Sequence, residues 1–267
     1  MTAYRAAVRR TVAVTPLMRR ITLGGESLRD YSGSGLPDES CRVVFPGEIT
    51  RNYTIRRRDP AAEEIDIDFV LHDGGVASAW AAAVEPGAEI TISGAPAGKY
   101  HPAPDVPWRR LIGDATALPA IGRAVEELPA GARALVVVVV DNPNERQTFD
   151  TQGDVDIEWV YARSGDAGDA LRRIACDRDL PEGPGYTWVA GEAAATRDIR
   201  RRFRHTFGLT ADRYDTVGYW RLGAERWERR YQEVAGIVDP KLAAADAIED
   251  DEQYFDAVDD IYAEVGL

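Results

Sequence analysis

A short segment at residues 51–56 combines positive charges, an aromatic ring and hydroxyl groups. It reads Arg-Asn-Tyr-Thr-Ile-Arg and stands at the start of a predicted strand. A flavin needs a cation for its phosphates, a flat ring against the isoalloxazine and hydrogen-bonding groups at the ring edge; Arg51, Tyr53 and Thr54 can supply all three. Strand alternation places Arg51 and Tyr53 on one face and Thr54 on the other. An ordinary exposed strand with flanking arginines could contain the same residue types, so this segment alone leaves both interpretations open.

A second segment, residues 68–80, has the composition of an anion-binding turn. It leads from Asp68 through His72, Gly74 and Gly75 into a predicted helix over residues 78–84. Small residues before a helix leave backbone N–H groups accessible, and the positive end of the helix dipole favours a phosphate. Ser78 could reach a phosphate oxygen or simply cap the helix. His72 could contact the cofactor or serve as a structural hydrogen-bonding group.

The elements around these segments predict a β-barrel in the first hundred residues. Strands are expected at residues 4–15, 18–23, 42–45, 52–57, 64–71 and 89–93, separated by Gly, Pro, Asp and Ser. Alternating apolar residues at 65–71 indicate a half-buried strand. Strands at such short spacing are typical of a closed barrel. Residues 94–99 resemble a phosphate loop but are one residue short and lack the following Ser or Thr, so we expect a turn there.

From about residue 104 strands alternate with helices. Strands are expected at residues 110–113, 135–140, 157–161 and 186–190, and helices at residues 117–128, 167–174 and 195–207. The fully apolar strand at 135–140 is typical of a parallel sheet covered on both faces, and the alternation predicts right-handed βαβ units in a nucleotide-binding sheet. No Gly-x-Gly-x-x-Gly fingerprint follows the strand at 110–113, so residues 116–119 would have to bind a dinucleotide differently.

The C-terminal residues combine an apolar stripe with many acids. Residues 239–267 contain ten Asp or Glu against one Lys, a balance of −9 within the net charge of −13. We expect a docked terminal helix with a solvated acidic face, and a partner-binding tail is the alternative. The arginines between residues 197 and 204 could attract an anion, form a solvated face or pair with these acids. The apolar stripe consists of Tyr254, Phe255, Val258, Ile261, Tyr262 and Val265.

Length and composition fit two domains with real cores. We place a barrel domain at residues 1–103, an α/β domain at 104–237 and a helical extension at 238–267. No apolar run approaches the roughly 20 residues of a membrane span, and we read no signal peptide. Cys41 and Cys176 are too few for a disulfide framework, which favours the cytoplasm. The acidic charge argues against nucleic-acid binding, and the histidines and cysteines show no metal-ligand spacing.

Along most of its length the sequence resembles the siderophore-interacting protein family, a branch of the ferredoxin-reductase-like flavoproteins. The order and spacing of the matching segments extend over more than two hundred residues. Ala115 stands where the family usually has an acid, Val76 where it often has proline, and one residue is missing between His72 and Gly75. The matching segments are residues 15–23, 51–56, 68–72, 77–81, 113–121, 190–192 with Arg197 and Arg200, and 218–221.

The resemblance implies that FAD takes electrons from NADH or NADPH and passes them to Fe(III) in a ferric siderophore, without a catalytic side chain or a protein metal ligand, because the cofactor performs the redox steps. A general flavin or ferredoxin-type reductase, which leaves room for a ferredoxin partner, and a non-enzymatic carrier of a ferric chelate or flavin are the alternatives. The implied FAD contacts are Arg51, Asn52, Tyr53, Thr54, Asp68, Val70, Leu71, His72, Gly75, Ala77, Ser78, Tyr219 and Trp220. The implied NAD(P)H contacts, at the carboxyl ends of the parallel strands, are Asp114, Thr116, Ala117, Gly191, Glu192 and Arg197.

The end of the strand at 135–140 bears on the choice of donor. Asp141, with Glu145 just beyond, could accept hydrogen bonds from a ribose hydroxyl and repel a 2′-phosphate. Arg146 and Arg197 could instead bind that phosphate, and residues 141–144 could be a plain turn. We expect NADH to be preferred.

Overall fold

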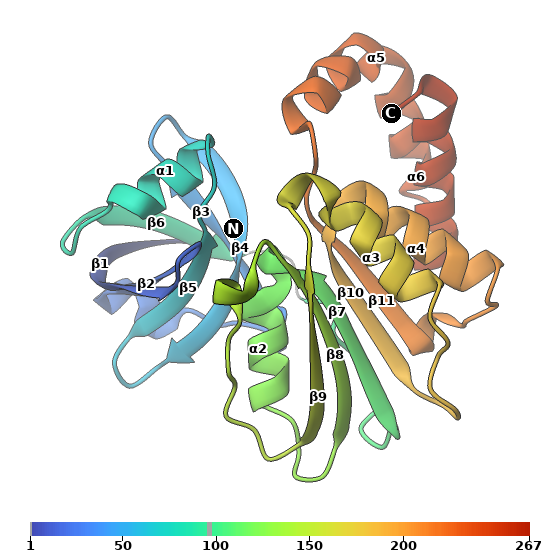
Figure 1. Ribbon diagram of the computed structural model, residues 1–267. Coiled ribbons are helices and arrows are strands. Elements are labelled where there is room, and N and C mark those ends of the chain that lie inside the picture. The colour runs from blue at the N-terminus through green and yellow to red at the C-terminus, as the bar shows by residue number, and fades with distance from the viewer. Residues whose placement is uncertain (1, 95–97) are drawn as a thin grey trace.

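The computed structural model describes residues 2–94 and 98–267 and shows a β-barrel, a parallel sheet with helices on both faces, and two C-terminal helices (Figure 1). In these residues no helix is both long enough and apolar enough to cross a membrane. The turn expected at residues 94–99 lies partly outside the described residues.

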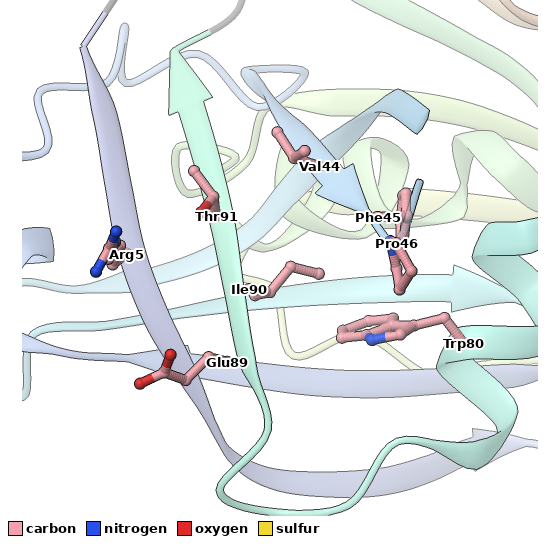
Figure 2. Close-up of a pocket in the computed structure, with 8 residues that line it drawn as sticks. All are labelled: Arg5, Val44, Phe45, Pro46, Trp80, Glu89, Ile90 and Thr91. Atoms are coloured by element: carbon pink, nitrogen blue, oxygen red, sulfur yellow. The ribbon is translucent and has the colours of Figure 1, made fainter. Parts of the chain in front are cut away.

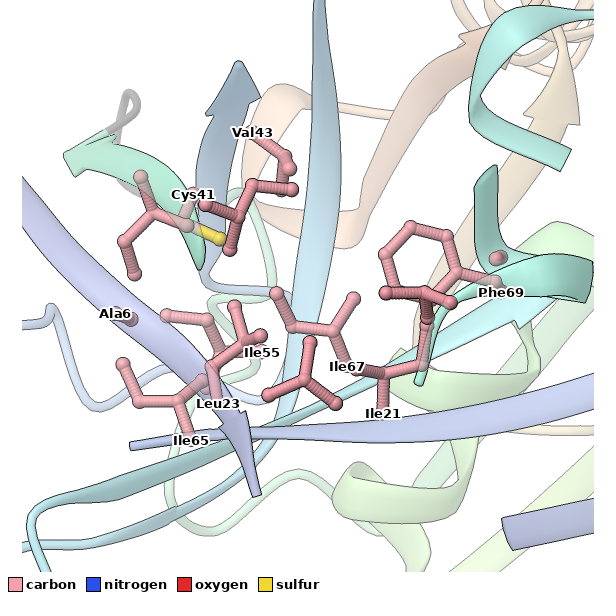
Figure 3. Close-up of a cluster of buried hydrophobic side chains, with 14 of the residues drawn as sticks. Ala6, Ile21, Leu23, Cys41, Val43, Ile55, Ile65, Ile67 and Phe69 are labelled. Atoms are coloured by element: carbon pink, nitrogen blue, oxygen red, sulfur yellow. The ribbon is translucent and has the colours of Figure 1, made fainter. Parts of the chain in front are cut away.

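The barrel closes in the strand order β1-β2-β5-β4-β3-β6, with every pair antiparallel. Alternate side chains fill its interior: Ile67 on β5 pairs with Ile21 on β2 and Ile55 on β4, and all three are fully buried (Figure 3). The predicted barrel is therefore confirmed. The strands are β1 (Ala3–Thr15), β2 (Met18–Gly24), β3 (Ser40–Phe45), β4 (Ile49–Asp59), β5 (Glu64–Val70) and β6 (Glu89–Gly94), with helix α1 (Val76–Ala83) between β5 and β6.

Strand β5 is more buried than its alternation predicted. Its polar side chains Asp66 and Asp68 are also buried. Asp66 accepts a hydrogen bond from Thr22, and Asp68 forms a two-pronged ion pair with Arg20 at 2.6 and 2.8 Å. Buried carboxylates are tolerated when they are paired in this way, so the outer face of β5 can be covered too.

The second domain is a five-stranded parallel sheet of order β11-β10-β7-β8-β9. Helix α2 packs on one face with Leu111 and Val136, and helices α3 and α4 pack on the other with Ile112 and Val137. Burial on both faces explains the continuous apolar run in β8. The elements are β7 (Trp108–Asp114), α2 (Leu118–Glu126), β8 (Arg133–Val140), β9 (Asp154–Tyr161), α3 (Ala167–Cys176), β10 (Tyr186–Glu192), α4 (Ala193–His205) and β11 (Tyr214–Trp220).

Two helices follow the sheet, α5 (Ala224–Ala245) and α6 (Asp251–Val265), and they pack against each other through Trp227 and Tyr262, whose ring centres are 5.9 Å apart. Helix α6 lies along α4 (Figure 1). The expectation that its acids form a solvated face differs from the structure, because several of them pair with the arginines of α4. Helix α5 had no counterpart in the sequence analysis, and it runs without a break through the domain boundary that we placed after residue 237.

Polar contacts join the barrel to the sheet domain. Arg56 on β4 forms an ion pair with Glu126 on α2 at 2.6 Å. Glu145, which follows β8, accepts hydrogen bonds from the hydroxyl of Thr15 and, at 3.1 Å, from the amide of Leu17. Glu145 is buried and bonded at the β1–β2 turn, and it also borders the cleft described below. Its suggested contribution to an adenosine site therefore stays a prediction.

Candidate functional site

A cleft of about 1050 Å³ lies between the barrel and the carboxyl ends of the parallel strands. Strand β4 and the β5–α1 turn form its wall on the barrel side, and the ends of β7 and β11 form the opposite wall. All thirteen residues predicted to bind FAD line it: Arg51, Asn52, Tyr53, Thr54, Asp68, Val70, Leu71, His72, Gly75, Ala77, Ser78, Tyr219 and Trp220.

Strand β4 presents a cation and an aromatic ring to this cleft. Arg51 is exposed, and among the described residues its guanidinium donates to the backbone carbonyl of Thr50 at 2.8 Å. Its charge is therefore free to meet an anion. Tyr53 is held by Phe69, whose ring centre is 4.3 Å away. Burial raises the pKa of Tyr53 to about 12, so its hydroxyl stays protonated near neutral pH.

The β5–α1 turn is shaped by its own side chains. The hydroxyl of Ser78 donates to the carbonyl of His72 at 2.8 Å and accepts from its amide at 2.9 Å. Helix α1 begins at Val76, two residues before the expected start, with Gly75 at its N-cap and no side chain capping it. The φ of Gly75 is 84°, a left-handed conformation that favours glycine. The uncapped amides of the first turn are therefore available to an acceptor.

The end of β11 supplies two aromatic side chains to the opposite wall. The ring of Tyr219 packs edge-on to Trp188, with centres 6.3 Å apart. Its hydroxyl is buried and has no hydrogen-bond partner among the described residues. Trp220 is fixed by a hydrogen bond from its indole nitrogen to Asp114 at 2.7 Å.

The residues predicted to bind NAD(P)H fall into two groups. Asp114 and Thr116 line the cleft. Ala117 is buried in the core beside α2, and the carboxylate of Glu192 caps helix α4. Arg197 lies on α4, 3.8 Å from Asp259 of helix α6. Gly191 and these three residues are absent from the cleft lining, so their roles stay predictions.

The sequence analysis missed several lining residues, of which Lys99 and Arg221 carry positive charge. The ammonium of Lys99 lies 4.2 Å from the ring centre of Phe255, and the guanidinium of Arg221 lies 4.3 Å from that of Trp227. Burial and then the neighbouring charge of Arg197 lower the pKa of Arg221. The available signal was the Gly-Lys pair at residues 98–99, which we had read as part of a turn.

A second hollow, of about 440 Å³, lies on the barrel (Figure 2). Phe45, Pro46 and Trp80 line it together with the charged residues Arg5 and Glu89. It contains none of the predicted site residues. Within residues 2–94 and 98–267 no group of three His, Cys, Asp or Glu side chains is arranged to hold a metal ion.

A closed antiparallel barrel followed by a parallel sheet, with the cleft between them, defines a ferredoxin-reductase-like fold. The H286L mutant of ferredoxin-NADP+ reductase from Plasmodium falciparum has this fold, with a TM-score of 0.65 over 81% of this chain and 96% of that one. At 10% identity the likeness concerns the fold alone and lends no support to a ferredoxin partner.

The chain belongs to the siderophore-interacting protein family. A family model described as siderophore-interacting protein matches residues 106–223, and one described as siderophore-interacting FAD-binding domain matches residues 47–100. A siderophore utilization protein from T. fusca shares 30% identity and a TM-score of 0.75, covering 83% of this chain and 94% of that one.

Two of the relatives are named as reductases of ferric chelates. The NADPH-dependent ferric-chelate reductase of Escherichia coli is 30% identical over 80% of this chain and 91% of its own length. The ferric vibriobactin reductase ViuB of Vibrio cholerae is 26% identical over 84% of this chain and 91% of its own length.

Proposed function

We propose that this protein is an FAD-dependent reductase that takes electrons from NADH or NADPH and reduces Fe(III) held by a siderophore, releasing Fe(II). The observation that carries the proposal is the cleft: segments 166 residues apart in sequence, around Tyr53 and Tyr219, form one binding space. The names of the relatives and the family's FAD-binding domain support the same conclusion. The cytoplasmic location stays a prediction.

The residues of the cleft fit a flavin dinucleotide. Arg51 offers a cation without an acidic partner among the described residues, and the first turn of α1 offers uncapped amides, so the two diphosphate charges have complementary groups. The hydroxyl of Tyr219 is a buried donor that lacks a partner in the described chain. Buried polar groups are nearly always hydrogen-bonded, so a ligand that supplies an acceptor there accounts for it. FMN, with one phosphate, would leave part of this surface unused.

The protein's own part in the reaction is to bind and to orient. FAD, when bound, would supply the redox chemistry, accepting hydride from the nicotinamide and releasing single electrons to iron. Tyr53 and Tyr219 come from opposite walls, so together they would define the plane of the flavin ring. Asp141 and Thr116 lie where an open α/β sheet places a nucleotide, outside the carboxyl ends of its strands. The siderophore would hold the Fe(III) until it is reduced, so no protein metal ligand is needed.

The purified protein tests this proposal directly. The cofactor released on heating is identified by chromatography, and FAD is expected rather than FMN. Oxidation of NADH and of NADPH is then followed with and without a ferric siderophore, while a ferrous-specific chromophore traps Fe(II). Donor oxidation that depends on the ferric chelate supports the proposal. Equal turnover with free flavins would instead indicate a general flavin reductase, and bound ligand without turnover would indicate a carrier.

A further inference from the structure

Asp114, at the end of the central strand β7, is a buried carboxylate with all its bonds made inside the protein. It is 3% exposed. One oxygen accepts from the amide and the hydroxyl of Thr116 at 2.9 and 2.5 Å, and the other accepts from the indole of Trp220 at 2.7 Å. Burial raises the pKa of Asp114, while the hydrogen bonds from Thr116, Trp220 and the backbone of Glu192 lower it. Among the described residues the carboxylate is therefore held by hydrogen bonds from neutral groups.

The bond to Trp220 crosses a whole strand. Asp114 ends β7 and Trp220 ends β11, but β10 lies between these strands in the sheet. The bond passes over Gly191, where a Cβ atom would come within 2.4 Å of the bonded oxygen of Asp114. The φ of Gly191 is 151°, within the range that favours glycine. The missing side chain at Gly191 is thus what allows β7 and β11, the two neighbours of β10, to be connected.

A second buried acid holds the same segment two residues further on. Glu192 accepts from the amide of Leu222 at 3.2 Å with one oxygen and from the amide of Ala195 at 2.8 Å with the other. Residues 220–222 line the cleft and lead directly into helix α5. The carboxyl ends of β7 and β10 therefore each fix one point of this piece of cleft wall.

We propose that Asp114 is a positioning residue, which holds the indole of Trp220 in the cleft wall and so sets how closely the electron donor approaches the flavin site. This inference rests on the proposed function for its kinetic part only. Both oxygens of Asp114 already accept hydrogen bonds from protein donors, so in this proposal it acts through Trp220 and not through a ligand contact of its own. Displacing a wall by about 1 Å can cost up to about a hundredfold in rate, because the reacting atoms lose their approach geometry.

Two conservative variants separate positioning from bulk structure. Asp114→Asn keeps the shape, but its amide group has one acceptor oxygen and cannot serve both Thr116 and Trp220. Trp220→Phe keeps an aromatic ring and removes the N–H. Asp215→Asn is a matched control, because Asp215 also accepts a hydrogen bond from an aromatic side chain in this sheet, that of Tyr186 at 2.9 Å, and it does not line the cleft.

The first measurement is the indole N–H spectrum of the cofactor-loaded protein labelled with 15N-tryptophan. Six tryptophan signals are expected, and Trp220→Phe identifies the one from Trp220. Asp114→Asn should move that signal and leave the signal of Trp108, which donates to the carbonyl of Glu182 at 3.0 Å, in place. The control variant should move neither. A Trp220 signal that does not respond to Asp114→Asn overturns the proposal.

The second measurement is the rate of flavin reduction by NADH or NADPH. Asp114→Asn and Trp220→Phe should each lower kcat/KM for the donor by about tenfold or more. The double variant should have a kcat/KM no lower than that of the less active single variant, because both substitutions remove the same contact. The control Asp215→Asn, outside the cleft, should keep the wild-type kcat/KM. Additive losses, or unchanged donor kinetics with a moved Trp220 signal, refute the positioning role. If wild type oxidises neither donor, the proposed function fails, and the spectrum still decides whether Asp114 holds Trp220.

Discussion

Replacing Arg200 by methionine should loosen helix α6 from helix α4. The guanidinium is 7% exposed and donates to three acids of α6, Glu252, Asp256 and Asp259, at 2.9, 2.6 and 2.7 Å. Removing one member of a buried ion network costs about 3–5 kcal/mol, because the remaining charges lose their partner. Arg204 still reaches Glu252 and Asp256, and water can enter beside Asp256, so we expect about 3 kcal/mol, the lower end.

Hydrogen exchange and thermal unfolding measure the effect locally and globally. Amides of α6 should exchange faster in Arg200→Met, and the Tm should fall by about 6–12 °C if the whole domain responds, at about 2–4 °C per kcal/mol. Arg172→Met is the control, because Arg172 pairs with Asp169 and Asp198 at the surface, where such pairs contribute at most about 1 kcal/mol. Unchanged protection of α6, or equal Tm values for the two variants, would refute the assignment of Arg200 as the main anchor.

Three further predictions concern the cleft and the sheet. Arg51→Ala should weaken FAD binding by about 1.5–3 kcal/mol through loss of a charge-assisted phosphate contact, measured by titration calorimetry with Arg57→Ala as control; an unchanged Kd removes Arg51 from the site. NADH should be the better donor, and Asp141→Asn should raise kcat/KM for NADPH relative to NADH, whereas a wild-type preference for NADPH contradicts this. Burial raises the pKa of Asp215 to about 6 despite the hydrogen bond from Tyr186, above its unfolded value of about 3.9, so the folded state holds that proton more tightly and stability falls as pH rises between these values. Asp215→Asn should reduce this loss of stability with rising pH. Urea unfolding at a series of pH values measures the free energy of unfolding, and a variant with the wild-type pH dependence would count against the prediction.

Much of the fold could be predicted because the responsible patterns are local. The alternation in β5 and the unbroken valines of β8 each indicate a strand without any knowledge of its neighbours. Helix α5 gave no such signal, because Gly236 and Pro240 lie inside it, and both residues disfavour helix interiors. Both are exposed, so water can bond the carbonyl that Pro240 leaves without a donor.

The same difference between local patterns and distant contacts applies to the candidate site. The segment at Arg51 and the turn at Gly75 are continuous in sequence, so their chemistry could be read from residue types. Glu145 could not be assigned, because its partners lie about 130 residues earlier in the chain and only the packing of the two domains brings them together. Ser78 was open between two roles. Its hydroxyl does not cap helix α1 but bonds the backbone of His72, and its contact with a phosphate stays a prediction.

The bond between Glu145 and the β1–β2 turn has a consequence for how the chain is made. The barrel strands end at Gly94, so during synthesis all of them leave the ribosome before Glu145 is added. The hydroxyl of Thr15 and the amide of Leu17 must then be bonded to water until the sheet domain arrives and replaces that water with a carboxylate. We therefore expect the nascent barrel to fold first, as N-terminal domains generally do, and to gain its full resistance to unfolding only when the second domain has docked onto it.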